Sequence, residues 1–179
     1  MRLIPTLLLF AFATPLYAQS APPATASAAA PGCGDVGIKF DVKSDKSQHP
    51  FAKPDAGKAL LYFLQDDSYF VSHPRPTTRF GIDGNWVGAT QSDAYFYVSV
   101  DPGEHHLCAG WQSFVSVNTA HRSAAAHFTA EPGGVYFFIV RDQSQHETRP
   151  AGMKFETLDS DEAQLLMSKF AFSTSHTRK

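Results

Sequence analysis

Histidines are the residues whose number and spacing first suggest chemistry in this chain, which has eight of them among 179 residues. His105 and His106 are adjacent, and neighbouring side chains of an extended strand point to opposite faces, so these two would not hold the same ion. His121 and His127 follow and could approach His105, which makes a metal site of these three one interpretation. The other is a partly buried His105, on the same face as Leu107, that hydrogen-bonds the preceding turn.

The motifs of common catalytic sites are missing from the sequence. It has no His-Glu-x-x-His or Cys-x-x-Cys pair, no Gly-x-Ser-x-Gly and no glycine-rich phosphate loop. Acidic groups occur at Asp66 and Asp67, in a polar stretch, and at Asp159, Asp161 and Glu162, where a predicted helix begins and negative charge complements the helix dipole. We interpret both groups as solvated, and expect no catalytic residues, no cofactor and no metal ion.

Aromatic residues offer a third candidate, a platform for a sugar or a peptide. Tyr95 and Tyr97 alternate with Phe96 and Val98, so their rings lie opposite the predicted core and are either exposed or covered by a helix. If any aromatic surface binds a ligand or partner, we expect it to involve Tyr95, Tyr97 and Trp86.

The chain contains two cysteines, Cys33 and Cys108. Cys108 alternates with Leu107 and Ala109, so its side chain points away from the face that carries Trp111. In an oxidising compartment the two are expected to form an intrachain disulfide. The alternatives are a lipidated Cys33, which its Ala/Pro/Ser surroundings disfavour, and a bridge between two chains.

These candidates depend on a series of predicted strands. In residues 95–111 two alternating apolar runs flank Asp101-Pro102-Gly103, which has type II turn chemistry, and we predict a hairpin there. The nearly continuous apolar run 59–64 predicts a central strand covered on both faces. Asp83-Gly84 predicts a second hairpin turn. Further strands are expected near 38–42, 77–82, 85–89, 126–130, 135–141 and 153–158.

One helix is predicted near the C-terminus. Asp159 can cap it, and Ala163, Leu166, Met167 and Phe170 fall on one side at helical spacing, so this stripe should cover a face of a sheet. Closely spaced strands with Gly/Pro turns, followed by one helix, predict a mainly β fold. We expect an antiparallel β-sandwich of the immunoglobulin or prealbumin type with one C-terminal α-helix.

The N-terminus is typical of a secretory signal. Arg2 precedes the apolar stretch from Leu3 to Leu16, which is too short to span a membrane, and Ala18 offers a cleavage point before Gln19. We expect a periplasmic or secreted protein without a lipid anchor. Its expected parts are a signal peptide (1–18), a disordered Ala/Pro/Ser linker (19–32), a stapled N-terminal segment (33–57), the sandwich domain (58–172) and a tail (173–179).

Composition adds two expectations about partners. The formal net charge is −2, so the chain lacks the basic excess that nucleic acid selects, and we expect no nucleic-acid partner. Beyond the signal, no stretch is long and apolar enough for a transmembrane helix.

Four pieces of the sequence follow one order: GKALLYFL (57–64), FGIDGNWVG (80–88), YFYVSVDPGEHHL (95–107) and AEPGGVYFFIV (130–140). Strand, Asp-Gly hairpin, Val-x-Pro-Gly-x-His turn and Gly-x-Tyr strand together resemble bacterial domain-of-unknown-function family 2846 and, more loosely, domains with a Pro-Glu-Gly-Ala motif. The resemblance covers roughly residues 57–170. It implies an exported or lipid-anchored envelope β-sandwich and carries over no catalytic residues. The chain departs from the pattern by lacking a well-placed lipobox and by adding the Cys33 segment.

Two functions from different classes are consistent with these observations. The first is a non-catalytic envelope module, structural or partner-binding, whose partner is an envelope protein or a glycan. The second is a periplasmic protein that binds a small ligand or a metal through His105, His121 and His127. An enzyme ranks third, because no catalytic motif supports it.

Overall fold

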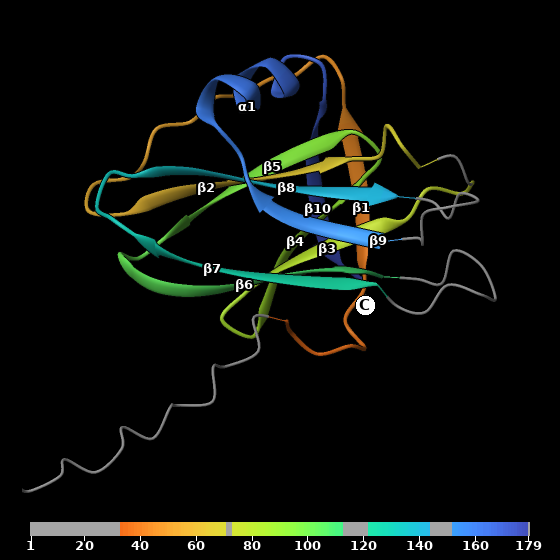
Figure 1. Cartoon of the computed structure of the whole chain (residues 1–179), viewed down its shortest axis with the longest axis horizontal. Coiled ribbons are helices and arrows are strands. Elements are labelled where there is room, and N and C mark those ends of the chain that lie inside the picture. The colour runs from red at the N-terminus through yellow and green to blue at the C-terminus, as the bar shows by residue number, and fades with distance from the viewer. Residues whose placement is uncertain (1–32, 71–72, 113–121, 144–151, 179) are drawn as a thin grey trace, which may run out of the picture.

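The computed structural model describes residues 33–70, 73–112, 122–143 and 152–178 (Figure 1). The expected signal peptide and linker, and His121, therefore lie outside the described residues. The chain forms ten strands and one helix within this part. In chain order they are β1 (Phe40–Asp45), β2 (Ala59–Asp66), β3 (Thr77–Ile82), β4 (Asn85–Gln91), β5 (Ala94–Val100), β6 (Gly103–Trp111), β7 (Ser123–Ala130), β8 (Val135–Gln143), β9 (Gly152–Thr157), α1 (Ser160–Met167) and β10 (Ala171–Thr177).

The strands form two sheets that pack face to face, with α1 on the outside of one of them (Figure 1). The six-stranded sheet has the order β1-β10-β5-β2-β8-β9 and the four-stranded sheet the order β4-β3-β6-β7. This confirms the mainly β sandwich with one helix. The pairing is not purely antiparallel, because β2 with β8 and β10 with β5 run parallel.

The main core lies between the sheets and follows the predicted alternation. Leu61 and Phe63 of β2 meet Phe80 of β3 and Phe138 of β8, and all four side chains are at most 1% exposed. The predicted central strand is confirmed, because residues 59–64 are buried on both faces. Burying each of these side chains stabilises the fold by roughly 1.5–3 kcal/mol of transfer free energy.

The predicted Asp83-Gly84 hairpin is confirmed and joins β3 to β4. Both residues have positive φ, 49° and 81°, which is the backbone of a type I′ turn. The predicted hairpin at Asp101-Pro102-Gly103 is wrong, because β5 belongs to the six-stranded sheet and β6 to the four-stranded sheet. The turn instead carries the chain across the sandwich. Val100 and Leu107, on either side of the turn, both point into the shared core. A hairpin within one sheet would show the same alternation of apolar residues, so the sequence pattern does not distinguish the two connections.

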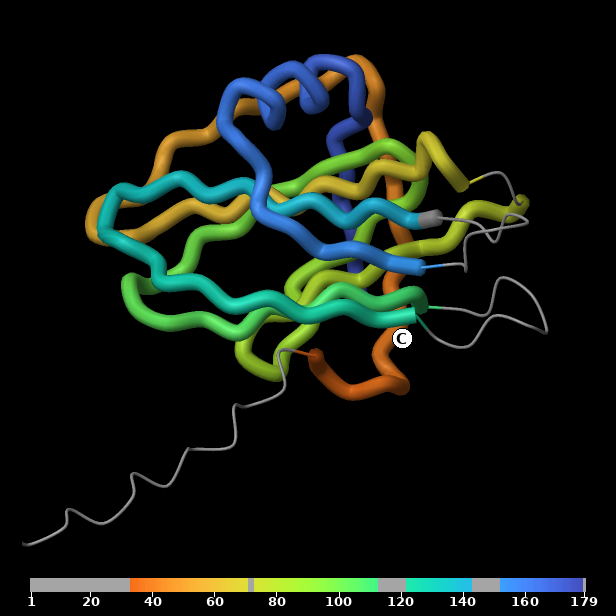
Figure 2. Tube along the Cα trace, in the orientation of Figure 1, coloured from red at the N-terminus to blue at the C-terminus, as the bar shows by residue number. Residues whose placement is uncertain are grey.

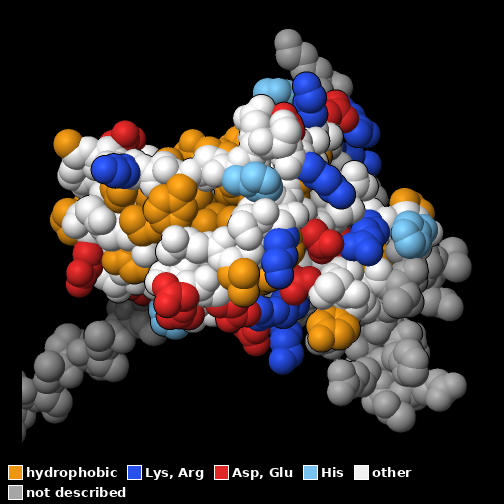
Figure 3. Space-filling view, turned by 90° about the horizontal axis from the view of Figure 1, so that it is seen from above, with side chains coloured by type: hydrophobic (Ala, Val, Ile, Leu, Met, Phe, Trp, Pro, Cys, Tyr) orange, Lys and Arg blue, Asp and Glu red, His pale blue; other side chains and the backbone are white. Residues whose placement is uncertain are grey.

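The predicted helix lies on the outer face of the six-stranded sheet. Asp159 caps it by accepting a hydrogen bond from the backbone N–H of Asp161 at 2.8 Å. Ala163 and Met167 are buried there with Phe170, which lies just after α1, against Leu60, Tyr62, Leu64, Tyr95, Phe137 and Ile139. Seen from this side, apolar side chains gather beside the helix (Figure 3). The predicted cover of a sheet face is therefore present.

The chain continues after the helix where a tail was expected. Ala171–Thr177 form β10, which pairs with β1 over its whole length and with β5 at its start. Ser173 and Ser175 of β10 bond the backbone of Ala89 in β4, at 3.0 Å each. These serines connect β10 of the six-stranded sheet to β4, the edge strand of the four-stranded sheet, so a polar segment completes the sandwich.

Candidate functional site

The N-terminal strap, residues 33–39, crosses the outer face of the four-stranded sheet, on the side of the molecule opposite to α1 (Figure 2). A disulfide between Cys33 and Cys108 holds its beginning to β6, with a Cα–Cα distance of 4.9 Å. The predicted intrachain bridge is thus present, and Cys108 points away from the Trp111 face as expected.

Two side chains of the sheet hold the middle of the strap. Trp86 of β4 donates its indole N–H to the carbonyl of Asp35 at 2.7 Å. Arg79 of β3 donates from Nη1 to the carbonyls of Val36, at 3.2 Å, and Ile38. The Arg79 guanidinium also lies 4.3 Å from the centre of the Trp86 ring, a cation–π arrangement. The strap is therefore fixed by polar contacts and one covalent bond.

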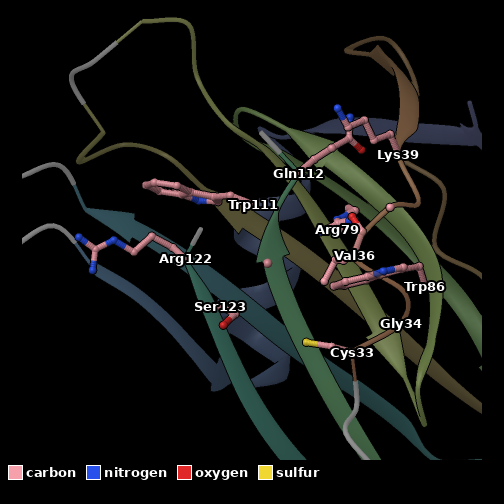
Figure 4. Close-up of a pocket in the computed structure, with 12 residues that line it drawn as sticks. Cys33, Gly34, Val36, Lys39, Arg79, Trp86, Trp111, Gln112, Arg122 and Ser123 are labelled. Atoms are coloured by element: carbon pink, nitrogen blue, oxygen red, sulfur yellow. The ribbon is translucent and has the colours of Figure 1, made fainter. Parts of the chain in front are cut away.

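A cavity of about 570 Å³ lies between the strap and the sheet. Lys39, Arg79 and Trp86 form one wall of it, and Trp111 and Arg122 lie at the other end (Figure 4). Its volume falls within the range of small-molecule sites. Gln112 lies beside it and pairs with the backbone N–H and C=O of Phe40, at 2.6 and 2.9 Å, so the end of the strap has a fixed position.

The charge of this cavity is one-sided. Lysine and arginine supply three of its lining residues, and none of the lining residues that the structure describes is an aspartate or a glutamate. Arg79 is 5% exposed, and burial lowers its pKa while the charge of Asp35 opposes that shift. Among the described residues, Arg79 takes part in no ion pair. Its Nε has no hydrogen-bond partner there either.

The three aromatic residues expected to form a binding surface do not come together. Trp86 lines the cavity of the four-stranded sheet, whereas Tyr95 and Tyr97 lie on the outer face of the six-stranded sheet. Tyr95 is fully buried and packs in the cluster beneath α1. Tyr97 is partly buried at the edge of that cluster. Expecting Tyr95 in a surface was therefore wrong, because the helix covers it.

The tyrosine hydroxyls of that face anchor a segment of the chain. Tyr62 accepts from the N–H of Ala52 at 2.6 Å, and Tyr95 donates to the carbonyl of Pro50 at 3.3 Å. Burial raises the pKa of Tyr95 to about 12, so its hydroxyl keeps its proton. Phe51 stacks on Tyr62 at 5.5 Å between ring centres. These tyrosines hold the connection between β1 and β2 on the sheet.

His105 has a structural role at the turn between the sheets. Its Nδ1 lies 2.6 Å from Asp83 Oδ2 and its Nε2 lies 2.8 Å from the carbonyl of Asp101. Burial by itself would lower the pKa of His105, but these two acceptors outweigh it and raise the pKa. Both ring nitrogens therefore have a partner within hydrogen-bond distance. The turn-bonding interpretation of His105 is confirmed.

The two described members of the proposed metal trio lie on opposite faces of the sheet. His127 pairs across the strands with His106, so these two share a face and His105 has the other. His127 is exposed, whereas the His105 side chain is 12% exposed. In the part of the chain that the structure describes, no three ligating side chains are grouped closely enough to hold a metal ion.

Two buried carboxyl groups lie inside the sandwich, where the sequence analysis expected a solvated acid. Asp67 and Asp142 are both fully buried. Gln65 donates to Asp67 Oδ1 at 2.9 Å and to Asp142 Oδ2 at 3.4 Å, and Thr78 donates to Asp142 at 3.3 Å. Burial raises the pKa of both carboxyls, and the charge of Asp67 raises that of Asp142 further. The solvated interpretation of Asp67 is therefore wrong.

A sequence signal for this buried pair existed. Gln65 and Asp67 continue the alternation of Leu61 and Phe63, and Asp142 continues that of Phe138 and Val140, so period-two counting places all three inside. Arg79 offered no comparable signal. Its importance comes from the strap, which reaches it from a distant part of the sequence.

Comparison with known proteins gives a family but no described activity. The family model "Protein of unknown function (DUF2846)" matches residues 55–153. An uncharacterised protein of Haemophilus influenzae is 22% identical over 135 residues, which cover 75% of this chain and 73% of that protein. No solved structure matches the chain. Within the described residues, no helix combines the length and apolar character that a membrane span requires.

Proposed function

We propose, starting from the fact that this chain belongs to the DUF2846 family of proteins of unknown function, that it is an exported, non-catalytic module of the bacterial cell envelope. Its role is structural or partner-binding, and the partner is an envelope protein or a glycan. The observation that carries the proposal is the Cys33–Cys108 disulfide, which fixes the strap to β6. Such bonds persist in oxidising compartments and are rare in the cytosol.

The surroundings of the ionisable groups support binding over catalysis. Both ring nitrogens of His105 already have acceptors. Asp67 and Asp142 lie in the interior of the sandwich, and neither lines the cavity under the strap. A general acid or base must reach the proton that it transfers, and these three groups are engaged elsewhere.

Export and oxidation are tested together in cells that produce the full chain. We expect the protein in the periplasmic or secreted fraction, with an N-terminus near Gln19 and no thiol that reacts with an alkylating reagent after denaturation. A Cys33→Ala variant is the matched control and should show one reactive thiol. A cytoplasmic chain with two reactive thiols would contradict the proposal, and a diacylglycerol-modified Cys33 would contradict the expectation that the protein has no lipid anchor.

The alternative with a histidine-bound metal predicts a different result. Tag-free protein would then contain stoichiometric zinc or copper, which a His127→Ala variant would lose. We expect no stoichiometric metal, because His105 and His127 lie on opposite faces. Metal analysis of the two proteins, purified in parallel, decides between the proposals.

A further inference from the structure

The cavity under the strap contains a buried positive charge that forms no ion pair with the described residues. Arg79 is 5% exposed and its Nε lacks a hydrogen-bond partner among the described residues. The carbonyls of Val36 and Ile38 accept two of its hydrogen bonds, but they carry no full charge. Burying an ion without a counter-charge is unfavourable, so an anion at this place would be favoured.

The described lining residues of the cavity add further positive charge, and the one nearby carboxylate, that of Asp35, offsets it only in part because burial still lowers the pKa of Arg79. Lys39 lies on the same wall, and Arg122 lies at the far end with its guanidinium directed away from Arg79 (Figure 4). Residues 113–121, which join Gln112 to Arg122 in the sequence, contain no aspartate or glutamate. Asp35 is near Arg79, but its carboxylate accepts from the N–H of Gly37 at 2.7 Å.

We propose that this cavity binds a small organic anion through Arg79, with Lys39 as the second cation and the Trp86 side of the cavity as the apolar wall. The planar guanidinium matches the two oxygens of a carboxylate or a phosphate group. The volume of about 570 Å³ suits a body the size of a sugar. The inference goes beyond the proposed function and does not depend on where the protein is located, because it concerns the purified protein.

The test is a nitrogen-edited NMR titration of the oxidised protein at constant ionic strength. The signals to follow are the Trp86 indole N–H and the Arg79 Nε–H. The probes are glucuronate, its neutral counterpart glucose, and inorganic phosphate, each up to about 50 mM, so that a Kd in the millimolar range is detected. We expect a saturable shift with at least one anion and none with glucose. A shift with glucuronate alone identifies a carboxylate site, and a shift with phosphate alone identifies a phosphate site.

Three variants separate the roles of the cations. Arg79→Lys keeps the charge but loses the planar fork, and should weaken binding of the anion about tenfold or more. Lys39→Gln changes an exposed side chain, so the fold is preserved, and should weaken binding about two- to fivefold. Lys46→Gln, outside the cavity, is the matched control and should have no effect. The inference is wrong if neither anion shifts these signals, if glucose shifts them as glucuronate does, or if Lys46→Gln weakens binding as much as Lys39→Gln.

Discussion

The two outer faces of this sandwich are covered in different ways. On the six-stranded sheet, α1 and the segment around Phe51 bury apolar side chains in a continuous cluster. On the four-stranded sheet, the strap is held by a disulfide, the hydrogen bonds of Arg79 and the bond from Trp86. The first cover leaves a pocket of about 200 Å³ between Phe51, Tyr95 and Met167, whereas the second leaves a larger cavity of about 570 Å³. A cover held by a few fixed points can coexist with an open site.

The side chains of the two covers show the same difference. Met167 and Phe170 are 4% and 7% exposed. In the strap, Val36 is 86% exposed and Ile38 is 38% exposed. The strap therefore gains little from burying its own apolar surface, and its position depends on its polar and covalent bonds.

The largest expected effect lies under the helix. Phe170→Ala should lower the free energy of unfolding by about 3–5 kcal/mol, because it removes a buried ring. Leu165→Ala is the control, since Leu165 of α1 is 57% exposed, and should change the free energy of unfolding by no more than about 0.5 kcal/mol. Urea unfolding measures both. Equal effects of the two changes would show that the helix is not docked as described.

Loss of the disulfide should have the next largest effect. Replacing Cys33 and Cys108 together by alanine should cost about 2–4 kcal/mol, because the bond closes a long loop in the unfolded chain. The strap should also open locally, so a protease should cleave the folded variant near Lys39 before it cleaves elsewhere. If cleavage there stays as slow as in the oxidised protein, the polar contacts alone hold the strap.

Gly34→Ala tests how closely the strap packs against Trp86 while the disulfide is intact. A Cβ at this position would lie 2.6 Å from Trp86 Cδ1 and 2.9 Å from the backbone nitrogen of Trp86. We expect a loss of about 1–3 kcal/mol in unfolding and a shifted Trp86 indole signal. Gly37→Ala is the matched change, because its Cβ would meet only the Asp35 carboxylate, at 3.3 Å. If neither variant changed the free energy of unfolding or the Trp86 signal, the strap would lie further from the sheet than described.

The smallest expected effect concerns the two buried carboxyl groups inside the sandwich, those of Asp67 and Asp142. Burial raises the pKa of Asp67 to about 6 and of Asp142 to about 7, from 3.8. The folded state therefore keeps protons that the unfolded state releases, so stability is present at low pH and is lost as pH rises through these values. The loss is roughly 1–2 kcal/mol per proton between pH 5 and pH 7.

Asp142→Asn checks this sign, because it should flatten the profile and make the protein more stable than the unmodified chain at pH 7. His105→Gln is the control. The pKa of His105 is raised above 6.5, so losing it should leave the slope below pH 6 unchanged. Chemical unfolding at several pH values measures both variants, and a steeper slope in Asp142→Asn would contradict the assignment.

The sequence predicted those features of the fold that depend only on residues close together in the chain, such as the turns. The Asp83-Gly84 turn needs positive φ at two adjacent residues, and these residue types adopt it. The turn at Pro102 was predicted as a turn but not as a crossing between sheets, because alternation is the same in both cases. β10 was missed because the residues that it bonds to Ala89 are serines, and a polar segment is typical of a tail.

The candidate site was less predictable than the fold. The disulfide followed from the number of cysteines and the predicted export, and Trp86 was chosen as an aromatic. Arg79 could not be found from the sequence, because its place in the site depends on contacts with the strap. The strap is distant in the sequence and reaches Arg79 only in the folded protein. Tyr95 was misplaced because the sequence does not show which face the helix covers.

The position of β10 has a consequence for how the chain assembles. Phe40, at the start of β1, pairs with Thr177, near the end of the chain. Synthesis proceeds from the N-terminus, so β1 is made before its partner and waits until β2 to β9 and α1 have been made. Pairings between such distant segments slow folding. A chain interrupted before β10 would expose the edges of β1 and β5, and unpaired edges promote association between chains. The six-stranded sheet is therefore complete only when β10 has been made.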